Sequence, residues 1–166
     1  MIKIGEKLPQ VTLHEFLDTE RDGCGIGPNK FAVDTLAKDK KIVVFGLPGA
    51  YTPTCSAQHV PGYVAHYDAF KAKGVDEIWC VSVNDAFVMG AWGRAQKVGT
   101  KVRMLGDGNA QFCKKLGLEC DLGEHGMGLR SQRYAMLVDH GVVKSMWVEA
   151  PGKFEVSSAE AVLKQI

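Results

Sequence analysis

Two runs of apolar residues along the chain are continuous rather than alternating, and each of them is short. They cover residues 41–47 and 77–83 and are rich in valine, isoleucine and aromatic side chains. Such runs are typical of strands buried on both faces of a sheet, because both faces then need apolar side chains. The pattern therefore predicts two central strands.

The segment between these runs has the pattern of an amphipathic helix that stops at Lys73-Gly74. Pro61 is expected to kink this helix, because proline cannot donate a backbone hydrogen bond. A strand, a helix and a second strand within about 40 residues predict a βαβ unit, whose two strands run parallel. The apolar positions of the helix recur at spacings of three and four; they are Val60, Tyr63, Val64, Tyr67 and Phe70.

A second helix is predicted directly after the second run. Residues 84–85 offer Asn and Asp as caps, and apolar positions recur through residues 87–98 until Gly99 stops the pattern. A short strand at 102–105 and a short helix at 109–116 are expected to follow.

The last third of the chain has the pattern of a hairpin and a closing helix. Residues 133–138 and 142–148 flank the turn Asp139-His140-Gly141, which is typical of two antiparallel strands. The sequence Ser157-Ser158-Ala159-Glu160 is a capping box, which predicts a helix that runs to Ile166. These elements predict an α/β fold of thioredoxin-like type: a central mixed sheet with a parallel βαβ unit and a C-terminal antiparallel hairpin, flanked by helices.

Composition and charge narrow the class of protein. The 166 residues, 46% of them hydrophobic, are enough for one domain spanning residues 1–166 with a single core. A formal net charge of +1 gives no electrostatic basis for binding nucleic acid or an anionic membrane surface. No apolar stretch reaches the roughly 20 residues that a membrane span needs, and the first residues lack the apolar region of a signal peptide. We therefore expect a cytoplasmic protein without nucleic-acid or membrane partners.

The five cysteines are odd in number and include no Cys-x-x-Cys pair. This pattern argues against a disulfide scaffold and against a zinc finger. It leaves packed thiols or a reactive thiol. The glycine-rich segment 18–29, which contains Cys24, has no preceding strand and no following helix in the predicted pattern, so it is interpreted as a surface loop rather than a dinucleotide site.

Cys55 has the most informative position among the cysteines. It follows the first predicted strand, and if Thr52 is the helix N-cap, then Pro53 is the first helical residue and Cys55 the third. A thiol there faces unpaired backbone N–H groups and the positive end of the helix dipole, both of which favour the thiolate. The alternative is a small buried side chain that happens to begin a helix. His59 lies one turn further on and is expected to project outward rather than act as a base.

The segment Pro48-Gly49-Ala50-Tyr51-Thr52-Pro53-Thr54-Cys55-Ser56 resembles the Pro-x-x-x-Thr-x-x-Cys motif of the peroxiredoxins, in the version of the type II, peroxiredoxin-5-like branch. The resemblance covers nearly the whole chain and is weakest over residues 18–29 and the final segment. Further similar segments are residues 71–75, 80–88, 92–95, 101–105 and 132–136.

The resemblance implies a thiol peroxidase that needs no metal, haem or nucleotide cofactor. Cys55 would attack a hydroperoxide and become a sulfenic acid. Thr52 would hold the thiolate and the peroxide through its hydroxyl, and Pro48 would shield the sulfur from water. Arg133 would be the active-site arginine, since a fixed cation favours the thiolate and the negative charge that develops on the departing oxygen. Without the resemblance, Arg133 would be interpreted as a solvated charge at a strand edge.

The sequence departs from the atypical two-cysteine members of the family, because residues 152–158, before the last helix, contain no cysteine. A one-cysteine cycle is therefore favoured, with glutathione and glutaredoxin, or thioredoxin, as reductant. Cys80, 25 residues after Cys55, lies in the second predicted strand, where core packing is favoured over a resolving role. Weak candidates for a resolving thiol are Cys24, Cys80, Cys113 and Cys120.

The resemblance also implies a homodimer with an interface near the active-site loops. Two other functions stay open: a peroxide sensor that passes its oxidation to a partner protein, and a non-catalytic thioredoxin-fold binding module. The module has no reason to contain Pro48, Thr52, Cys55 and Arg133 together.

Overall fold

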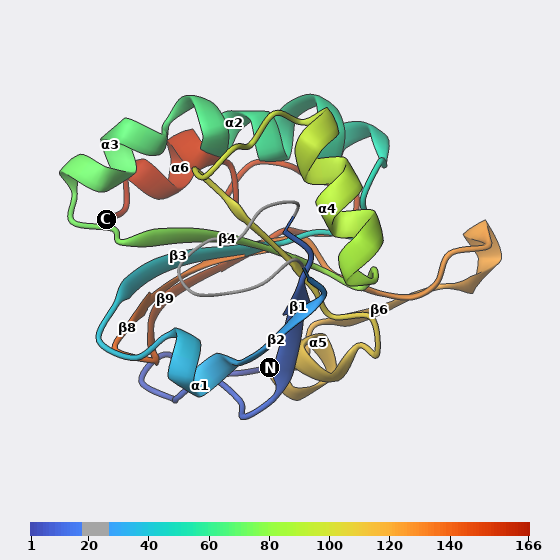
Figure 1. Ribbon diagram of the computed structural model, residues 1–166, viewed down its shortest axis with the longest axis horizontal. Helices are drawn as coiled ribbons and strands as arrows, with labels where there is room; N and C mark the ends of the chain where they lie inside the picture. The colour runs from blue at the N-terminus through green and yellow to red at the C-terminus, as the bar shows by residue number, and fades with distance from the viewer. Residues whose placement is uncertain (18–26) are drawn as a thin grey trace.

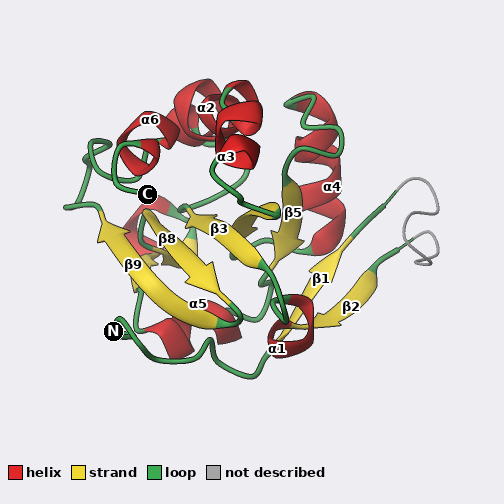
Figure 2. Cartoon of the chain, turned by 90° about the vertical axis from the view of Figure 1, so that its left-hand side faces the viewer, coloured by secondary structure: helices red, strands yellow, loops and turns green. Residues whose placement is uncertain are grey.

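The computed structural model describes residues 1–17 and 27–166 as a layered α/β protein built on a seven-stranded mixed sheet (Figures 1 and 2). Cys24 lies outside the described residues. In spatial order the strands of the sheet are β2 (Asn29–Ala32), β1 (Thr12–Glu15), β5 (Arg103–Gly106), β4 (Glu77–Ser82), β3 (Lys41–Gly46), β8 (Tyr134–Asp139) and β9 (Val142–Val148).

The two continuous apolar runs form β3 and β4, the pair at the centre of the sheet. They are parallel, with Val44 paired to Trp79, and β4 is also parallel to β5. Side chains of β3 alternate between two core layers: Ile42 and Val44 pack on one face, and Val43 and Phe45 on the other. This arrangement confirms the βαβ unit, and it explains why the run lacks polar residues.

Helices cover both faces of the sheet (Figure 1). On one face lie α2 (Val60–Ala65), α3 (Tyr67–Ala72), α4 (Ala86–Ala95) and α6 (Ala159–Leu163), and on the other lie α1 (Val33–Leu36) and α5 (Gln111–Leu116). The hairpin of β8 and β9 turns at His140 and Gly141, both with positive φ. The predicted α/β thioredoxin-like architecture is therefore confirmed.

The first helical region differs from the expected single kinked helix. A π-helical turn, Cys55–His59, precedes α2, and its first carbonyl accepts a hydrogen bond from Val60 N–H. Pro61 stands within the first residues of α2, and the helix breaks later, at His66. The wide π turn accommodates the residues just before the proline, where regular α-helical bonding would fail.

Two other helix ends lie away from their predicted positions. Asp85 caps α4, accepting from Val88 N–H at 2.9 Å, but the helix ends at Ala95, before Gly99. Ser158, rather than Ser157, caps α6 by accepting from Ala161 N–H at 3.2 Å, and that helix ends at Leu163. Ser157 has a different hydrogen-bond partner, described below.

Some elements were not predicted, because their apolar runs are short. The first are β1 and β2, which extend the sheet beyond β5; β2 takes in Asn29, which the sequence assigned to a loop. The others are the four-residue helix α1 and two strands, β6 (Glu119–Leu122) and β7 (Gly128–Ser131); these two strands form a separate two-stranded ribbon, linked through a short 3-10 turn. Figure 1 shows the end of this ribbon extending away from the body of the protein.

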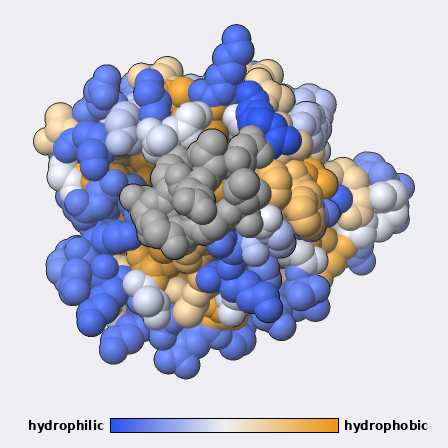
Figure 3. Space-filling view, viewed as in Figure 1, coloured by the Kyte–Doolittle hydropathy of each residue, from blue (hydrophilic) through white to orange (hydrophobic). Residues whose placement is uncertain are grey.

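In the view of Figure 3, hydrophilic residues lie mainly around the outline of the molecule, and hydrophobic residues gather nearer the middle of this face. Within residues 1–17 and 27–166, no helix is long and apolar enough to cross a membrane.

Candidate active site

The loop that carries the Pro-x-x-x-Thr-x-x-Cys motif leaves the carboxyl end of β3 and is held by the end of β4. Ala50 N–H donates to Asn84 Oδ1 at 3.0 Å, and Ser82 Oγ donates to the same oxygen at 2.7 Å. Tyr51 has a φ of 62°, in the left-handed region, and it is exposed. The loop therefore has a defined conformation at the edge of the sheet where open α/β proteins bind ligands.

Cys55 is the third residue of the helical backbone that begins at Pro53, as expected. The expected side-chain cap is absent, because the Thr52 hydroxyl donates to the Gly49 carbonyl at 2.8 Å. The carbonyl of Thr52 accepts the helical bond from Ser56 N–H at 3.0 Å. With its only hydrogen used on Gly49, the Thr52 hydroxyl retains acceptor capacity toward the site.

Arg133 is brought to Cys55 by the antiparallel pairing of β8 with β3. Gly46, the last residue of β3, is paired with Tyr134, the first residue of β8. Arg133 therefore lies beside the point at which the motif loop begins. Its Nη2 donates to Cys55 Sγ at 3.3 Å, although the two residues are 78 positions apart. The sulfur belongs to a fully buried residue, and its partner is a cation.

His59 contradicts the expectation that it projects outward. It is fully buried on the same face of the helical turn as Cys55, against the ring of Phe45 at 4.8 Å. Burial and the neighbouring Arg133 lower the pKa of His59 to about 3, so the imidazole is neutral. Its Nδ1 lies 3.0 Å from Arg133 Nη1, which makes Nδ1 an acceptor. His59 is therefore a partner of Arg133 and not a base for Cys55.

Phe154 forms one wall of the site and was not identified from sequence. Its ring lies edge-on to His59, with centroids 5.0 Å apart, and the Arg133 guanidinium carbon lies 5.7 Å from its centroid. It lies in the segment 152–158, whose sequence shows the absence of a cysteine and the start of a capping box but gives no sign of a role for Phe154. An isolated aromatic residue in a loop gives no pattern by which sequence could find it.

Pro48 is half-buried at the start of the motif loop and is linked to a second arginine that sequence reasoning did not identify. Arg130 of β7 donates through Nη1 to the Pro48 carbonyl at 3.4 Å and through Nε to the Met127 carbonyl at 2.9 Å. A Cβ on Gly49 would lie only 2.8 Å from Arg130 Nη1. Gly49 therefore permits the close approach of the ribbon to the motif loop.

The other described cysteines have unequal access to solvent. Cys80 and Cys113 are buried, while Cys120 is half-buried on β6, opposite Arg130. Burial and the charge of Cys55 raise the pKa of Cys80 well above its ordinary value. Burial and Asp107 raise the pKa of Cys113 to about 12. Both thiols are therefore protonated at neutral pH.

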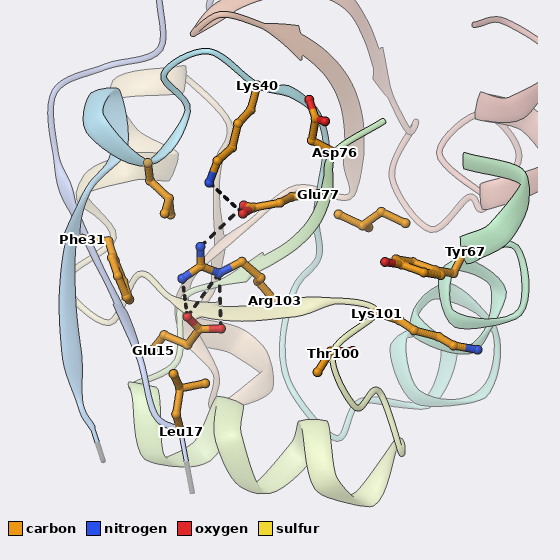
Figure 4. A pocket seen from close by; sticks show the side chains of 12 residues that line it. Glu15, Leu17, Phe31, Lys40, Tyr67, Asp76, Glu77, Thr100, Lys101 and Arg103 are labelled. Atoms are coloured by element: carbon orange, nitrogen blue, oxygen red, sulfur yellow. Dashed lines mark hydrogen bonds and ion pairs between the residues drawn. The ribbon is translucent and has the colours of Figure 1, made fainter. Parts of the chain in front are cut away.

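A cavity of ≈ 520 Å³ lies near the amino ends of β4 and β5, away from the motif loop (Figure 4). Arg103 occupies its centre, 2.6 Å from Glu15 and 3.5 Å from Glu77, and Lys40 lies 2.7 Å from Glu77. These charges neutralise one another. The charged side chains at this cavity therefore form a structural network of ion pairs.

Comparison with known proteins agrees with this geometry. The Redoxin family model matches residues 3–163. Peroxiredoxin-2C of Arabidopsis thaliana is 42% identical over 99% of this chain and 98% of its own length. The reduced Prx3 of Vibrio vulnificus, crystallised in complex with H2O2, is 51% identical, covers 99% of both chains and superposes with a TM-score of 0.91. Peroxiredoxin 5 of Alvinella pompejana is 32% identical, with 99% and 97% coverage and a TM-score of 0.82.

The chain is a type II peroxiredoxin of the redoxin family. It is accordingly a thiol-dependent peroxidase, and peroxiredoxin chemistry uses cysteine thiols rather than a bound cofactor. Among residues 1–17 and 27–166, no three His, Cys, Asp or Glu side chains form a metal-binding group. The site of this peroxiredoxin is the buried thiol beside Arg133.

Proposed function

We propose that this peroxiredoxin reduces hydrogen peroxide and small alkyl hydroperoxides through Cys55. The thiolate attacks the terminal peroxide oxygen, an S–O bond forms and the O–O bond breaks. The sulfur is oxidised to a sulfenic acid, and the departing oxygen takes a proton and leaves as water or an alcohol. The observation that carries this proposal is the hydrogen bond from Arg133 Nη2 to Cys55 Sγ at 3.3 Å.

The surrounding groups support these roles. Arg133 favours the thiolate in the resting enzyme and the negative charge on the departing oxygen in the transition state. Thr52, whose hydroxyl hydrogen is donated to Gly49, accepts a hydrogen bond from the protonated peroxide oxygen. Pro48, half-buried at the start of the loop, limits the access of water to the sulfur.

We further propose a one-cysteine cycle. An external thiol attacks the sulfenic acid, an S–S bond forms and water leaves; a second thiol then restores the Cys55 thiolate and carries away the disulfide. Glutathione with glutaredoxin, or thioredoxin, supplies these thiols. Burial of Cys80 and Cys113 supports an external partner.

A homodimer and a cytoplasmic location complete the proposal. Exposed Tyr51 lies on the motif loop, where the dimer interface is expected. Sedimentation equilibrium and cell fractionation test these two points. Among the relatives, Peroxiredoxin-2E of Arabidopsis thaliana is described as chloroplastic and Peroxiredoxin-2F as mitochondrial.

The test is peroxide consumption by wild-type and Cys55→Ser protein, with Cys120→Ser as the control at a partly exposed thiol. We expect Cys55→Ser to consume no peroxide and Cys120→Ser to match the wild type. Mass spectrometry of peroxide-treated protein, with and without glutathione, then identifies the product formed on Cys55. A glutathione adduct on Cys55 supports the one-cysteine cycle, whereas an intramolecular disulfide to any other cysteine overturns it.

A further inference from the structure

Arg133 is held between two acceptors, and only one of them is the reacting sulfur. Its Nη2 donates to Cys55 Sγ at 3.3 Å and its Nη1 to His59 Nδ1 at 3.0 Å. A guanidinium fixed at two nitrogens has a defined plane and a defined distance to the sulfur. The nitrogen of His59 that faces Arg133 must therefore be an acceptor, so the position of the cation depends on which ring nitrogen of His59 carries the proton.

The Ser157 carbonyl decides this orientation. His59 Nε2 lies 3.1 Å from the Ser157 carbonyl oxygen, which can only accept, so the ring proton is on Nε2 and Nδ1 is free to accept from Arg133. Tyr63 also donates to this carbonyl, at 2.8 Å. The Ser157 carbonyl is thus a fixed acceptor behind the imidazole.

Glu149 holds the loop that presents this carbonyl. Its buried carboxylate oxygen Oε1 accepts four hydrogen bonds at 2.8 Å: from the backbone N–H groups of Glu155, Val156 and Ser157 and from the Ser157 hydroxyl. Glu149 N–H also donates to the Arg133 carbonyl at 2.9 Å. Glu149, directly after β9, therefore contacts both the main chain of Arg133 and the loop that leads into α6. Figure 2 shows the course of this loop from β9 to α6.

The hydrogen bonds that Glu149 accepts favour its ionised form. Burial opposes ionisation, but the hydrogen bonds from Ser157, Glu155 and Val156 outweigh it, and the pKa of this carboxyl lies below its usual value. The side chain is therefore a carboxylate at neutral pH.

We propose that Glu149 is a positioning residue for the peroxidase reaction: through Ser157 and His59 it fixes the plane of Arg133 beside Cys55. The inference rests on the proposed function, because it concerns the same sulfur. Glu149 does not touch Cys55. Its effect passes through three hydrogen-bonded links: Ser157 donates to the Glu149 carboxylate, His59 Nε2–H donates to the Ser157 carbonyl, and Arg133 donates to His59 Nδ1.

The test compares wild type with Glu149→Gln, which keeps the size of the side chain and removes the charge. Glu155→Gln is the matched control, because Glu155 lies in the same loop but its side chain is exposed and pairs only loosely with Lys153, at 3.8 Å. The first readout is the rate of H2O2 reduction by the reduced protein as a function of pH. For Glu149→Gln we expect about a tenfold loss at neutral pH and a midpoint of the pH profile moved upward.

The second readout is nitrogen NMR of the His59 imidazole, which reports the tautomer without depending on activity. We expect the Nε2–H form in wild type and in Glu155→Gln, and a mixture of tautomers in Glu149→Gln. A wild-type pH profile together with an unchanged Nε2–H tautomer in folded Glu149→Gln overturns the inference.

A loss of rate with no shift of the profile and no change of tautomer also overturns it, since that is the result of a purely structural role. If wild type itself consumes no peroxide, the proposed function fails. In that case the NMR result still decides whether Glu149 orients His59.

Discussion

Arg133 and Cys55 lie 78 positions apart in the chain, and a guanidinium nitrogen of the first is 3.3 Å from the sulfur of the second. The antiparallel pairing of β8 with β3 brings them together, because it places the start of β8 beside the loop that follows β3. A second nitrogen of the same guanidinium is bonded to His59. The cation is therefore a rigid part of the site rather than a mobile surface charge.

Replacing Arg133 is expected to slow the reaction of the reduced protein with H2O2. In Arg133→Met the loss of the cation removes stabilisation of the departing oxygen, which costs about 10²–10³-fold in rate by analogy with an oxyanion-hole donor. Arg133→Lys keeps the charge but cannot bond the sulfur and the imidazole together, so we expect an intermediate loss. Stopped-flow measurement of the second-order rate constant checks both values, and equal rates for Lys and Met would contradict the role of the two-nitrogen geometry.

Removing the Thr52 hydroxyl is expected to lower the rate by about tenfold, because a hydrogen bond to the peroxide worth ~1.4 kcal/mol is lost. Thr52→Val has nearly the same shape as threonine but lacks the hydroxyl, whereas Thr52→Ser retains it. The hydroxyl also bonds the Gly49 carbonyl, so thermal unfolding of each variant must accompany the kinetics. A serine variant as slow as the valine variant would show that the methyl group, and not the hydroxyl, matters.

The buried His59 makes the stability of the protein dependent on pH. Its pKa is about 3 in the folded protein, chiefly because of burial and then of Arg133, against 6.5 for an unperturbed histidine. Between those pH values the unfolded chain binds a proton that the folded protein does not bind. The unfolding free energy therefore falls as the pH decreases from about 6.5 to about 3, by up to roughly 1.4 kcal/mol per pH unit from this group alone.

Urea unfolding at several pH values from 7 to 4 measures this dependence. His59→Gln cannot be protonated, so its unfolding free energy should fall less steeply with decreasing pH than that of wild type. His140→Gln, at an exposed position on the hairpin turn, is the control. Parallel curves for wild type and His59→Gln would argue against a neutral buried imidazole.

The network around Arg103 is expected to affect stability without affecting catalysis. Arg103 lies 2.6 Å from buried Glu15 and bonds Glu77, at the opposite end of β4 from the motif loop. Arg103→Met leaves two carboxylates without their shared cation, and removing one partner of a buried ion pair costs about 3 kcal/mol or more. Thermal unfolding should show a clear decrease in midpoint, while the rate with H2O2, measured well below that midpoint, should stay at the wild-type value.

Limited alkylation of the native protein is expected to separate the cysteines by access. Among the three described thiols other than Cys55, only Cys120 is partly exposed, and it should react with iodoacetamide first. Cys80 and Cys113 are buried and protonated, so they should react only after unfolding. Peptide mass mapping before and after addition of urea gives the order. Early labelling of Cys80 would show that β4 opens in solution.

Much of the fold could be predicted from sequence because its signals are local. The apolar runs of β3 and β4 need no partner to be recognised, and the turn at His140-Gly141 identifies the hairpin. The strands β1, β2, β6 and β7 were missed, since each has four residues, too few to give a recognisable apolar pattern. Of these, β1 also depends on a distant segment, because it pairs with β5.

In the candidate site, too, the features with a local sequence signal could be predicted and the others could not. The position of Cys55 at the start of a helix follows from the local order of threonine, proline and cysteine, and the motif gives the family resemblance. Three features did not follow from the sequence: the inward position of His59, the wall made by Phe154 and the hydrogen bond from Arg130 to the Pro48 carbonyl. Each of them depends on contacts between segments far apart in the chain.

By itself, the sequence determined the class of fold, the candidate reacting thiol Cys55 and the absence of a cysteine from residues 152–158. Only the tertiary structure decided how that cysteine is held: β8 brings Arg133 to the sulfur, and the loop after β9 brings Glu149 and Ser157 behind His59. The physical reason is the separation along the chain between the residues that interact. Propensity and capping act over a few residues, whereas the hydrogen bonds that orient the guanidinium join segments separated by 74 to 98 positions.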